Sequence, residues 1–214
     1  MEKTLTNDWI DISVALQEGM AQWPGDPAFS LDKDCTIKDD NVNVSSVSIC
    51  LHTGTHIDAP LHYIENGVDI SSLDLNKLVG LARVIEIKNS TWITIEELQL
   101  HGIKKGDRIL FKTKNSSVDW ILHPFLETFV ALTNEAAEYL AATGVALVGI
   151  DYLSISGVHN APVVHQALLG SGVCIVEGLN LSEVTEGNYD LVCLPVKIKN
   201  ADGAPGRVII RKIQ

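Results

Sequence analysis

The sequence predicts an α/β protein with a single domain and a mixed sheet. In the second half of the chain, segments with helix signals alternate with apolar, strand-like runs, whereas the first half and the C-terminal tail are rich in strands. A chain of 214 residues can also bury one sizeable core. Because no linker, repeat or low-complexity segment interrupts the chain, we expect one domain over residues 1–214.

The first half contains few long regular elements. Residues 9–16 alternate in polarity and predict a first strand, and residues 23–27 (Trp-Pro-Gly-Asp-Pro) predict a turn. Residues 43–51 predict a strand that ends at a histidine-rich segment. The pair Asn66-Gly67 predicts a further turn.

Helices and strands alternate after residue 80. A capping box at Thr94-Ile-Glu-Glu97 predicts a short helix to about Leu100. A helix over 134–142 can be capped by Thr133 and ended by Gly144, and Pro162 marks the start of a helix that ends at Gly170. Strands are expected at 81–88, 108–113, 145–151, 173–176, 191–198 and 207–210.

Composition excludes several classes of partner. With 46% hydrophobic and 20% charged residues the chain is globular. A net charge of −11 argues against nucleic acid or an anionic membrane, since both require a basic face. No apolar run reaches the roughly eighteen residues that span a bilayer, and the N-terminus lacks the apolar core of a signal peptide. We expect a cytoplasmic protein with a small-molecule substrate.

The four cysteines are Cys35, Cys50, Cys174 and Cys193, and they form no C-x-x-C pair. Cys50, Cys174 and Cys193 lie in apolar, strand-like runs, where cysteine usually acts as a small hydrophobic residue. We interpret these three as reduced core residues. A thiolate nucleophile is the less favoured alternative.

The segment from Leu51 to His62 concentrates the residues suited to chemistry. His52, His56, Asp58 and His62 fall within it. Neutral imidazole and carboxylate are the ligands that divalent zinc, manganese or iron prefer. The segment therefore predicts a metal site; the alternative is a group of partly buried histidines with ordinary hydrogen-bond partners.

The backbone of this segment is predicted to be extended and bent. His56 and Asp58 are two residues apart, so both point to one face of a strand. A fully extended chain would separate His52 from His56 by about 13 Å, at roughly 3.3 Å per residue. One ion cannot bridge that distance, so we expect a bend at Gly54. Pro60 should end the pairing and return His62 toward the cluster.

A second set of ligands should come from the ends of later strands, because loops at one edge of an α/β sheet usually line its site. The candidates are Asp151, His159, His165 and Glu177. His165 and Glu177 lie on a helix and at the end of the strand that follows it, so both could reach one point. A solvated glutamate and a surface histidine are an equally good interpretation of these two residues.

The motif His52-x-Gly-Thr-His56-x-Asp58-x-Pro60-x-His62 resembles the signature of the cyclase family of metal-dependent hydrolases, which includes bacterial kynurenine formamidase (arylformamidase) and isatin hydrolase. The similarity extends to Trp23-Pro-Gly-Asp26 and to segments 149–151, 177–179, 194–197 and 202–205. This resemblance implies a swivelling β/β/α fold. It also implies a homodimer or homotetramer whose sites lie near the subunit contact.

Residue by residue, the resemblance implies His52, His56 and Asp58 on one metal ion. Asp58 would bridge to a second ion, completed by His165 and Glu177. His62 would be the catalytic proton shuttle, and Trp23 would form part of the substrate pocket wall. We expect two divalent ions per subunit, with zinc in first place and manganese as the alternative.

The activity implied is a metal-dependent amidohydrolase acting on N-formyl-L-kynurenine, a kynurenine formamidase that releases kynurenine and formate. His62, with an ordinary pKa near 6.5, could pass the proton of water to the leaving amine. One alternative is hydrolysis of isatin or another cyclic amide or ester, and another is a metal-binding protein without catalysis. Arg83 and Arg207 could meet a substrate carboxylate, although a surface role is favoured for both.

Overall fold

The computed structural model describes residues 8–213. Its strands are β1 (Ile10–Asp11), β2 (Ser30–Cys35), β3 (Val44–Ser48), β4 (His56–Asp58), β5 (Val79–Glu86), β6 (Trp92–Ile93), β7 (Arg108–Lys112), β8 (Ala131–Leu132), β9 (Leu147–Ile150), β10 (Cys174–Glu177), β11 (Gly187–Pro195) and β12 (Gly203–Lys212). Its α-helices are α1 (Ile37–Asp40), α2 (Leu75–Leu78), α3 (Ile95–Gln99), α4 (Asn134–Thr143) and α5 (Ala161–Gly170). Short 3-10 turns cover η1 (Pro60–His62), η2 (Ile70–Ser72), η3 (Lys114–Ser117) and η4 (Trp120–Leu122).

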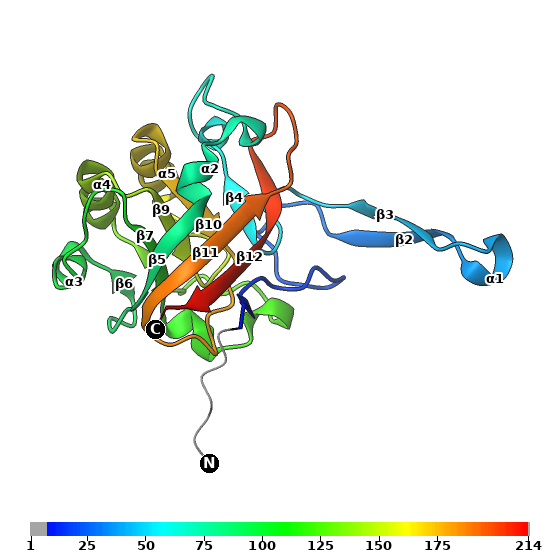
Figure 1. Cartoon of the computed structure of the whole chain (residues 1–214), viewed down its shortest axis with the longest axis horizontal. Helices are drawn as coiled ribbons and strands as arrows, with labels where there is room; N and C mark the ends of the chain where they lie inside the picture. Colours follow the sequence, from blue (N-terminus) through cyan, green and yellow to red (C-terminus); the bar gives the residue numbers. More distant parts are fainter. Residues whose placement is uncertain (1–7, 214) are drawn as a thin grey trace, which may run out of the picture.

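The main sheet has eight strands in the order β1-β12-β11-β5-β7-β9-β10-β4, and an additional pairing of β12 with β4 closes seven of them into a barrel-like sheet (Figure 1). The central pairs β5–β7, β7–β9 and β9–β10 are parallel. The pairs made by β4, β11 and β12 are antiparallel. The prediction of a single α/β domain with a mixed sheet is confirmed.

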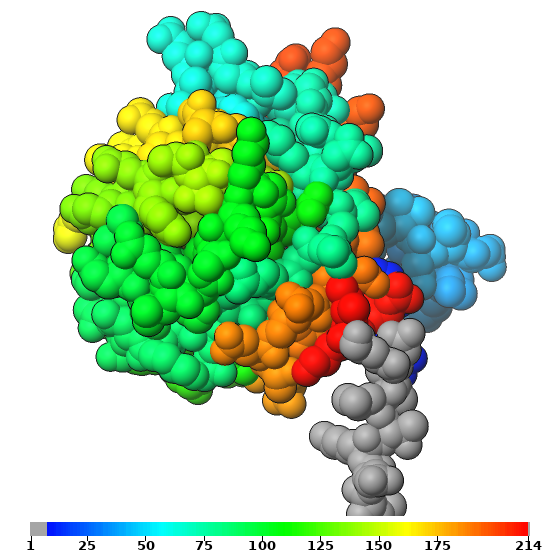
Figure 2. All heavy atoms as spheres, turned by 60° about the vertical axis from the view of Figure 1, so that its left-hand side comes forward, coloured from blue at the N-terminus to red at the C-terminus, as the bar shows by residue number. Residues whose placement is uncertain are grey.

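The parallel strands are buried on both faces, which explains their continuous apolar runs. Along β7, Leu110 points into the core enclosed by the barrel, whereas Ile109 and Phe111 point toward the helices. On β9, Leu147 likewise points into the core enclosed by the barrel, and Val148 points toward the helices. The second core lies beneath α3, α4 and α5, whose side of the molecule Figure 2 shows.

The predicted helix ends agree with the structure. The Thr94 and Thr133 hydroxyls accept hydrogen bonds from the first turns of α3 and α4. Gly144 adopts a left-handed conformation with φ 74° and ends α4. The turn at Asn66-Gly67 is also present, with φ 59° at Asn66.

Two strand predictions in the first half were wrong in extent. The strand expected over 9–16 pairs with β12 only at β1, because the chain then turns so that the Val14 N–H donates to the Thr55 hydroxyl at 2.8 Å. The strand expected over 43–51 is the shorter β3, and it does not enter the main sheet. It pairs only with β2, which the sequence analysis had not assigned.

Residues 30–48 (β2, α1 and β3) form an arm that projects from the body of the molecule (Figure 1). All five residues of β3 are exposed. Leu31 and Val47 are direct cross-strand partners on the arm and are 48% and 59% exposed. Ile37, in α1, is also exposed. The arm therefore presents apolar side chains that its own chain does not cover.

Within residues 8–213, none of the helices combines the length and the apolar character needed to cross a membrane. The longest helices, α4 and α5, have 10 residues each. A membrane span needs about 20 apolar residues.

Candidate metal centre

The centre is built on β4, a buried three-residue strand between β10 and β12. His56 lies directly opposite Glu177 of β10, so the antiparallel register brings these two side chains together. His56 Nε2 is 3.4 Å from Glu177 Oε2 and 3.5 Å from Asp58 Oδ1. The expected sharing of one strand face by His56 and Asp58 is therefore observed.

A tight turn brings His52 back to the strand. Gly54 has φ 67°, which confirms the predicted bend, and the His52 and His56 ring centroids are 5.1 Å apart. His52 Nδ1 is 2.9 Å from Asp58 Oδ1. A Cβ at Gly203 would lie 2.7 Å from His52 Cε1, so the first residue of β12 leaves room for this imidazole.

Helix α5 supplies the third imidazole. His165 Nε2 lies 3.2 Å from Glu177 Oε1 and 3.5 Å from Asp58 Oδ2. The two oxygens of Asp58 thus face different histidines: Oδ1 faces His52 and His56, and Oδ2 faces His165. Asp58 lies at the centre of all five candidate ligands.

In His56 and His165, the outer ring nitrogen is held by a backbone carbonyl. His56 Nδ1 is 3.0 Å from the Gly54 carbonyl oxygen, and His165 Nδ1 is 2.8 Å from that of Ala161. Carbonyls only accept, so each Nδ1 carries a proton and each Nε2 is directed at the carboxylates. Metal-ligating histidines are typically oriented in this way by a second partner.

The inner atoms of the cluster fit a divalent cation. Two trios, His52/His56/Asp58 and Asp58/His165/Glu177, each have their ligand atoms within 4.8 Å of one another. Within the described chain, His56 Nε2 and Asp58 Oδ2 are buried without a hydrogen-bond partner. Buried polar atoms without partners are costly, and a cation between them would supply the missing interaction.

Charge in the centre is balanced by the histidines when no cation is bound. Burial opposes protonation of His56, but the carboxylates of Asp58 and Glu177, 3.5 and 3.4 Å from its Nε2, prevail and raise its pKa to about 10. Burial would raise the pKa of Asp58, yet the hydrogen bond from His52 and the neighbouring His56 imidazole hold it well below its usual range. A divalent cation would compete with these protons for the same carboxylates.

His62 differs from the ligand candidates. Burial lowers its pKa, and the positive character of His52 and His165 lowers it further, although Asp58 opposes this. The His62 ring stacks on that of His52, with centroids 3.9 Å apart and planes at 24°. It sits beside the centre as a neutral imidazole with an accessible edge.

A cavity of about 320 Å³ opens onto these groups. It is lined by Trp23, Asp26, His52, His62, Tyr63, Leu153, Ser154, Val158, Ala161, Pro162, His165 and Glu177. Trp23 packs edge-on against Phe125 and Phe129, at centroid distances of 5.1 and 6.4 Å. The predicted wall residue therefore lines the same cavity as the catalytic candidate His62.

Comparisons with known proteins agree with this arrangement. A family model described as "Putative cyclase" matches residues 10–156, which is more than half of the chain. The kynurenine formamidase of Geobacillus thermodenitrificans is 40% identical over 215 residues, covering 98% of this chain and 100% of that protein. The chain belongs to the cyclase family.

Solved structures show the fold of this cyclase-family member as well. A structure described as a predicted metal-dependent hydrolase from Bacillus stearothermophilus has a TM-score of 0.84 at 35% identity, covering 95% of this chain and 97% of that one. Isatin hydrolase A from Labrenzia aggregata has a TM-score of 0.83 at 23% identity, covering 97% and 94%. The second likeness extends to the fold only.

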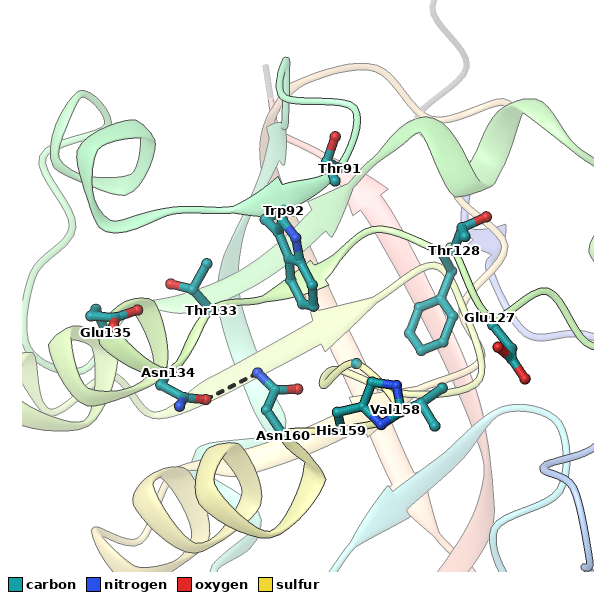
Figure 3. A pocket seen from close by; sticks show the side chains of 12 residues that line it. Thr91, Trp92, Glu127, Thr128, Thr133, Asn134, Glu135, Val158, His159 and Asn160 are labelled. Carbon is teal, nitrogen blue, oxygen red and sulfur yellow. Dashed lines mark hydrogen bonds between the residues drawn. The ribbon is translucent and has the colours of Figure 1, made fainter.

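Two of the four candidates for the second ligand set in this family member lie elsewhere. The carboxylate of Asp151 is buried and accepts hydrogen bonds from the backbone and hydroxyl of Thr113, both at 2.8 Å, and from Ser116. It ties β7 to β9. His159 is exposed and lines a separate cavity of about 540 Å³, beside Trp92 and Glu127 (Figure 3).

The arginines and cysteines lie outside the centre. Arg207 pairs with Asp11, and Arg83 lies 3.4 Å from Asp107. Of the four free cysteines, Cys174 and Cys193 are buried, as expected. Cys50 is only half-buried, so the prediction of a core position was wrong for it, because it lies in the turn before His52. Cys35, for which no core position was predicted, is also half-buried and ends an arm strand.

Several groups that contact the candidate ligands were not predicted from the sequence. The carboxylate of Asp202 lies 3.0 Å from His52 Nε2, and the Ile155 N–H donates to Glu177 Oε1 at 2.7 Å. Tyr63 stacks on the His165 ring at 4.4 Å. Asp202 lies in the segment 202–205 that carries the family resemblance, which was the available signal. Ile155 acts through its backbone and leaves no signal in the sequence.

Proposed function

We propose that this protein is a metal-dependent amidohydrolase that hydrolyses N-formyl-L-kynurenine to kynurenine and formate. The observation that carries the proposal is the convergence of three imidazoles and Glu177 on the buried carboxylate of Asp58, with the neutral His62 alongside. A relative that is 40% identical over its full length and is named kynurenine formamidase supports the choice of substrate.

His52, His56 and Asp58 would hold one divalent ion, and Asp58, His165 and Glu177 would hold a second. When bound, such ions supply an acidified water, with a pKa of about 7, and a Lewis acid for a carbonyl oxygen. The protein contributes the fixed geometry: the Gly54 and Ala161 carbonyls orient the imidazoles, and the Ile155 N–H orients Glu177.

His62 is the group suited to move the proton. Its lowered pKa keeps it neutral at pH 7, so it can accept a proton as water attacks the formyl carbon. It can then donate that proton to the amine nitrogen as the C–N bond breaks, which yields formate and the aryl amine. Because the same imidazole serves both steps, the reaction needs no other titrating side chain.

The cavity supports an aromatic substrate. Trp23, Leu153 and Val158 line the cavity together with His62 and provide apolar surface for an aryl ring. A volume of about 320 Å³ lies within the range of sites for small molecules. An aryl ring held there would exclude water from the formamide, apart from the reacting molecule.

The test combines elemental analysis of the purified protein with assays on N-formylkynurenine and on isatin. We expect turnover of N-formylkynurenine; hydrolysis of isatin alone would favour the alternative activity. Replacing His62 with alanine should lower kcat by about 10²–10⁴-fold and leave the metal content unchanged. Metal bound without turnover of either substrate would make the protein a non-catalytic metal binder.

We also propose that the protein acts as a homodimer or homotetramer. A two-stranded hairpin is marginally stable in isolation, yet the arm carries Leu31, Ile37 and Val47 exposed. A second copy of the chain packed against the arm would bury these side chains. Sedimentation of the purified protein measures the assembly directly.

Two predictions from the sequence accompany this proposal. Zinc is the first choice of native metal, because histidine with carboxylate suits it, and manganese is the alternative. The cytoplasmic location stays a prediction. Metal analysis of protein from its native cells tests the first, and cell fractionation tests the second.

A further inference from the structure

Asp202 lies at the end of the loop between β11 and β12, and this loop is anchored to the segment that follows β4. The Asp202 carbonyl oxygen accepts from the Ala59 N–H at 2.8 Å, and the Ala201 carbonyl oxygen accepts from the Ile70 N–H at 2.9 Å. The Asn200 N–H donates to the Asp69 carboxylate at 2.6 Å. These contacts fix the Asp202 backbone beside the segment that carries His62.

One carboxylate oxygen of Asp202 faces two imidazoles. Its Oδ2 is 3.0 Å from His52 Nε2 and 3.5 Å from His62 Nδ1. The two rings are stacked at 3.9 Å, so a single oxygen at their edge can contact both. The neighbouring Gly203 has no side chain to displace the His52 ring.

The contacts decide which nitrogen of each ring carries a proton. The Asp202 side chain is 45% exposed to solvent, and an ionised carboxylate only accepts hydrogen bonds. His52 Nε2, at 3.0 Å, therefore donates to Asp202, and His62 Nδ1, 3.5 Å from the same oxygen, is the nitrogen of its ring that faces this acceptor. This leaves His52 Nδ1 directed at Asp58, and His62 Nε2 as the basic nitrogen.

We propose that Asp202 is a positioning residue that orients both His52, as a metal ligand, and His62, as the proton shuttle. This inference rests on the proposed function. It assigns to one carboxylate two tasks that are usually separate: supporting a ligand and setting the tautomer of a base. The link would keep the shuttle in a fixed place relative to the metal centre.

The test compares Asp202→Asn with Asp69→Asn, which removes a charge from the same loop without touching an imidazole and keeps a side-chain oxygen that can accept from the Asn200 N–H. We expect Asp202→Asn to weaken binding of Zn²⁺, titrated against a chelator, by about 10–100-fold, as for other residues that support metal ligands. At saturating Zn²⁺ it should still lower kcat about 10-fold or more with little change in KM. Asp69→Asn should change neither quantity.

Two further measurements separate positioning from other roles. In a His62→Ala background, Asp202→Asn should cost no further kcat; an equal loss in both backgrounds would overturn the link to His62. Loss of one bound Zn²⁺ in Asp202→Asn would make Asp202 a ligand and would also overturn the proposal. This outcome is a real alternative, because His52, His62 and Asp202 themselves have ligand atoms within 4.8 Å of one another.

A spectroscopic readout needs neither a variant nor the substrate. The ¹⁵N spectrum of histidine-labelled, zinc-loaded wild-type protein should show the His62 proton on Nδ1. A proton on Nε2 would refute the inference. Because this spectrum and the zinc affinity are independent of substrate, they decide the role of Asp202 even if N-formylkynurenine is not hydrolysed.

Discussion

Removing the metal should make the stability of this protein fall as the pH rises from about 6.5 to about 10. In the metal-free centre, burial opposes the charge on His56, but Asp58 and Glu177 prevail and raise its pKa to about 10. A group with a higher pKa in the folded state binds its proton more tightly when folded. Its contribution is complete below the pKa of the unfolded chain and is lost as the pH passes through the folded value.

The change in the free energy of unfolding follows from the interval between the pKa of His56 in the unfolded chain and its pKa in the folded protein. One pKa unit corresponds to about 1.4 kcal/mol, so His56 alone accounts for on the order of 5 kcal/mol across the window. The pKa values of His52 and His165 are also raised by neighbouring carboxylates against the effect of burial, so they act in the same direction. Metal ligands must be deprotonated, so added Zn²⁺ should stabilise the protein more as the pH rises.

The assay is urea unfolding of chelator-treated protein at several pH values between 6.5 and 9.5, with and without Zn²⁺. Asp58→Asn should flatten the pH dependence of the metal-free protein, because it removes one of the charges that hold the proton. His123→Gln, at an exposed histidine in a loop, is the matched control and should leave the slope unchanged. A free energy of unfolding that stays constant or increases with pH in the metal-free protein would refute this reasoning.

Three other predictions follow from packing. Trp23→Ala should raise KM for an aryl formamide by roughly 2–10-fold, the value of an aromatic contact, whereas Trp92→Ala in the separate cavity should not; equal effects would remove Trp23 from the substrate wall. Gly178→Ala should lower the free energy of unfolding by more than about 1–2 kcal/mol, because its Cβ would lie 2.0 Å from the Gly54 carbonyl oxygen. Gly102 is also at positive φ but has open space around it, so Gly102→Ala should lower the free energy of unfolding by the backbone strain alone. Urea titration measures both variants. Val47→Lys on the arm should shift the sedimenting species toward the monomer, and an unchanged assembly would show that the arm does not hold the copies together.

Local signals in the sequence determined the regular parts of the second half. The two ends of α4, at Thr133 and Gly144, could be predicted because helix capping and left-handed backbone geometry depend on neighbouring residues only. The same holds for the bend at Gly54 and for the shared face of His56 and Asp58. The first ligand trio was therefore predictable as a geometric unit from twelve consecutive residues, from Leu51 to His62.

Local patterns in the sequence did not decide which distant residues join that trio; the family resemblance pointed to His165 and Glu177, and the tertiary structure gives the physical reason. Asp151 and Glu177 both stand at the ends of apolar strands, but β10 is the direct neighbour of β4, whereas β9 lies one strand further away. Glu177 consequently faces His56, and Asp151 is turned toward Thr113. Strand order depends on pairings between segments far apart in the chain, and the alternation of side chains does not encode it.

The positions of the arm and of Asp202 also depend on contacts between segments that are far apart in the chain. The sequence of β2 and β3 contains the residues of a hairpin, but only the structure shows that the pair leaves the main sheet. Asp202 reaches His52 and His62 because the loop before β12 is hydrogen-bonded to the segment after β4. By itself, then, the sequence determined the chemistry and the local bends of the centre. The pairings of β4 with β10 and with β12 decided which carboxylates surround it, because they bring Glu177 and Asp202 to the strand that carries Asp58.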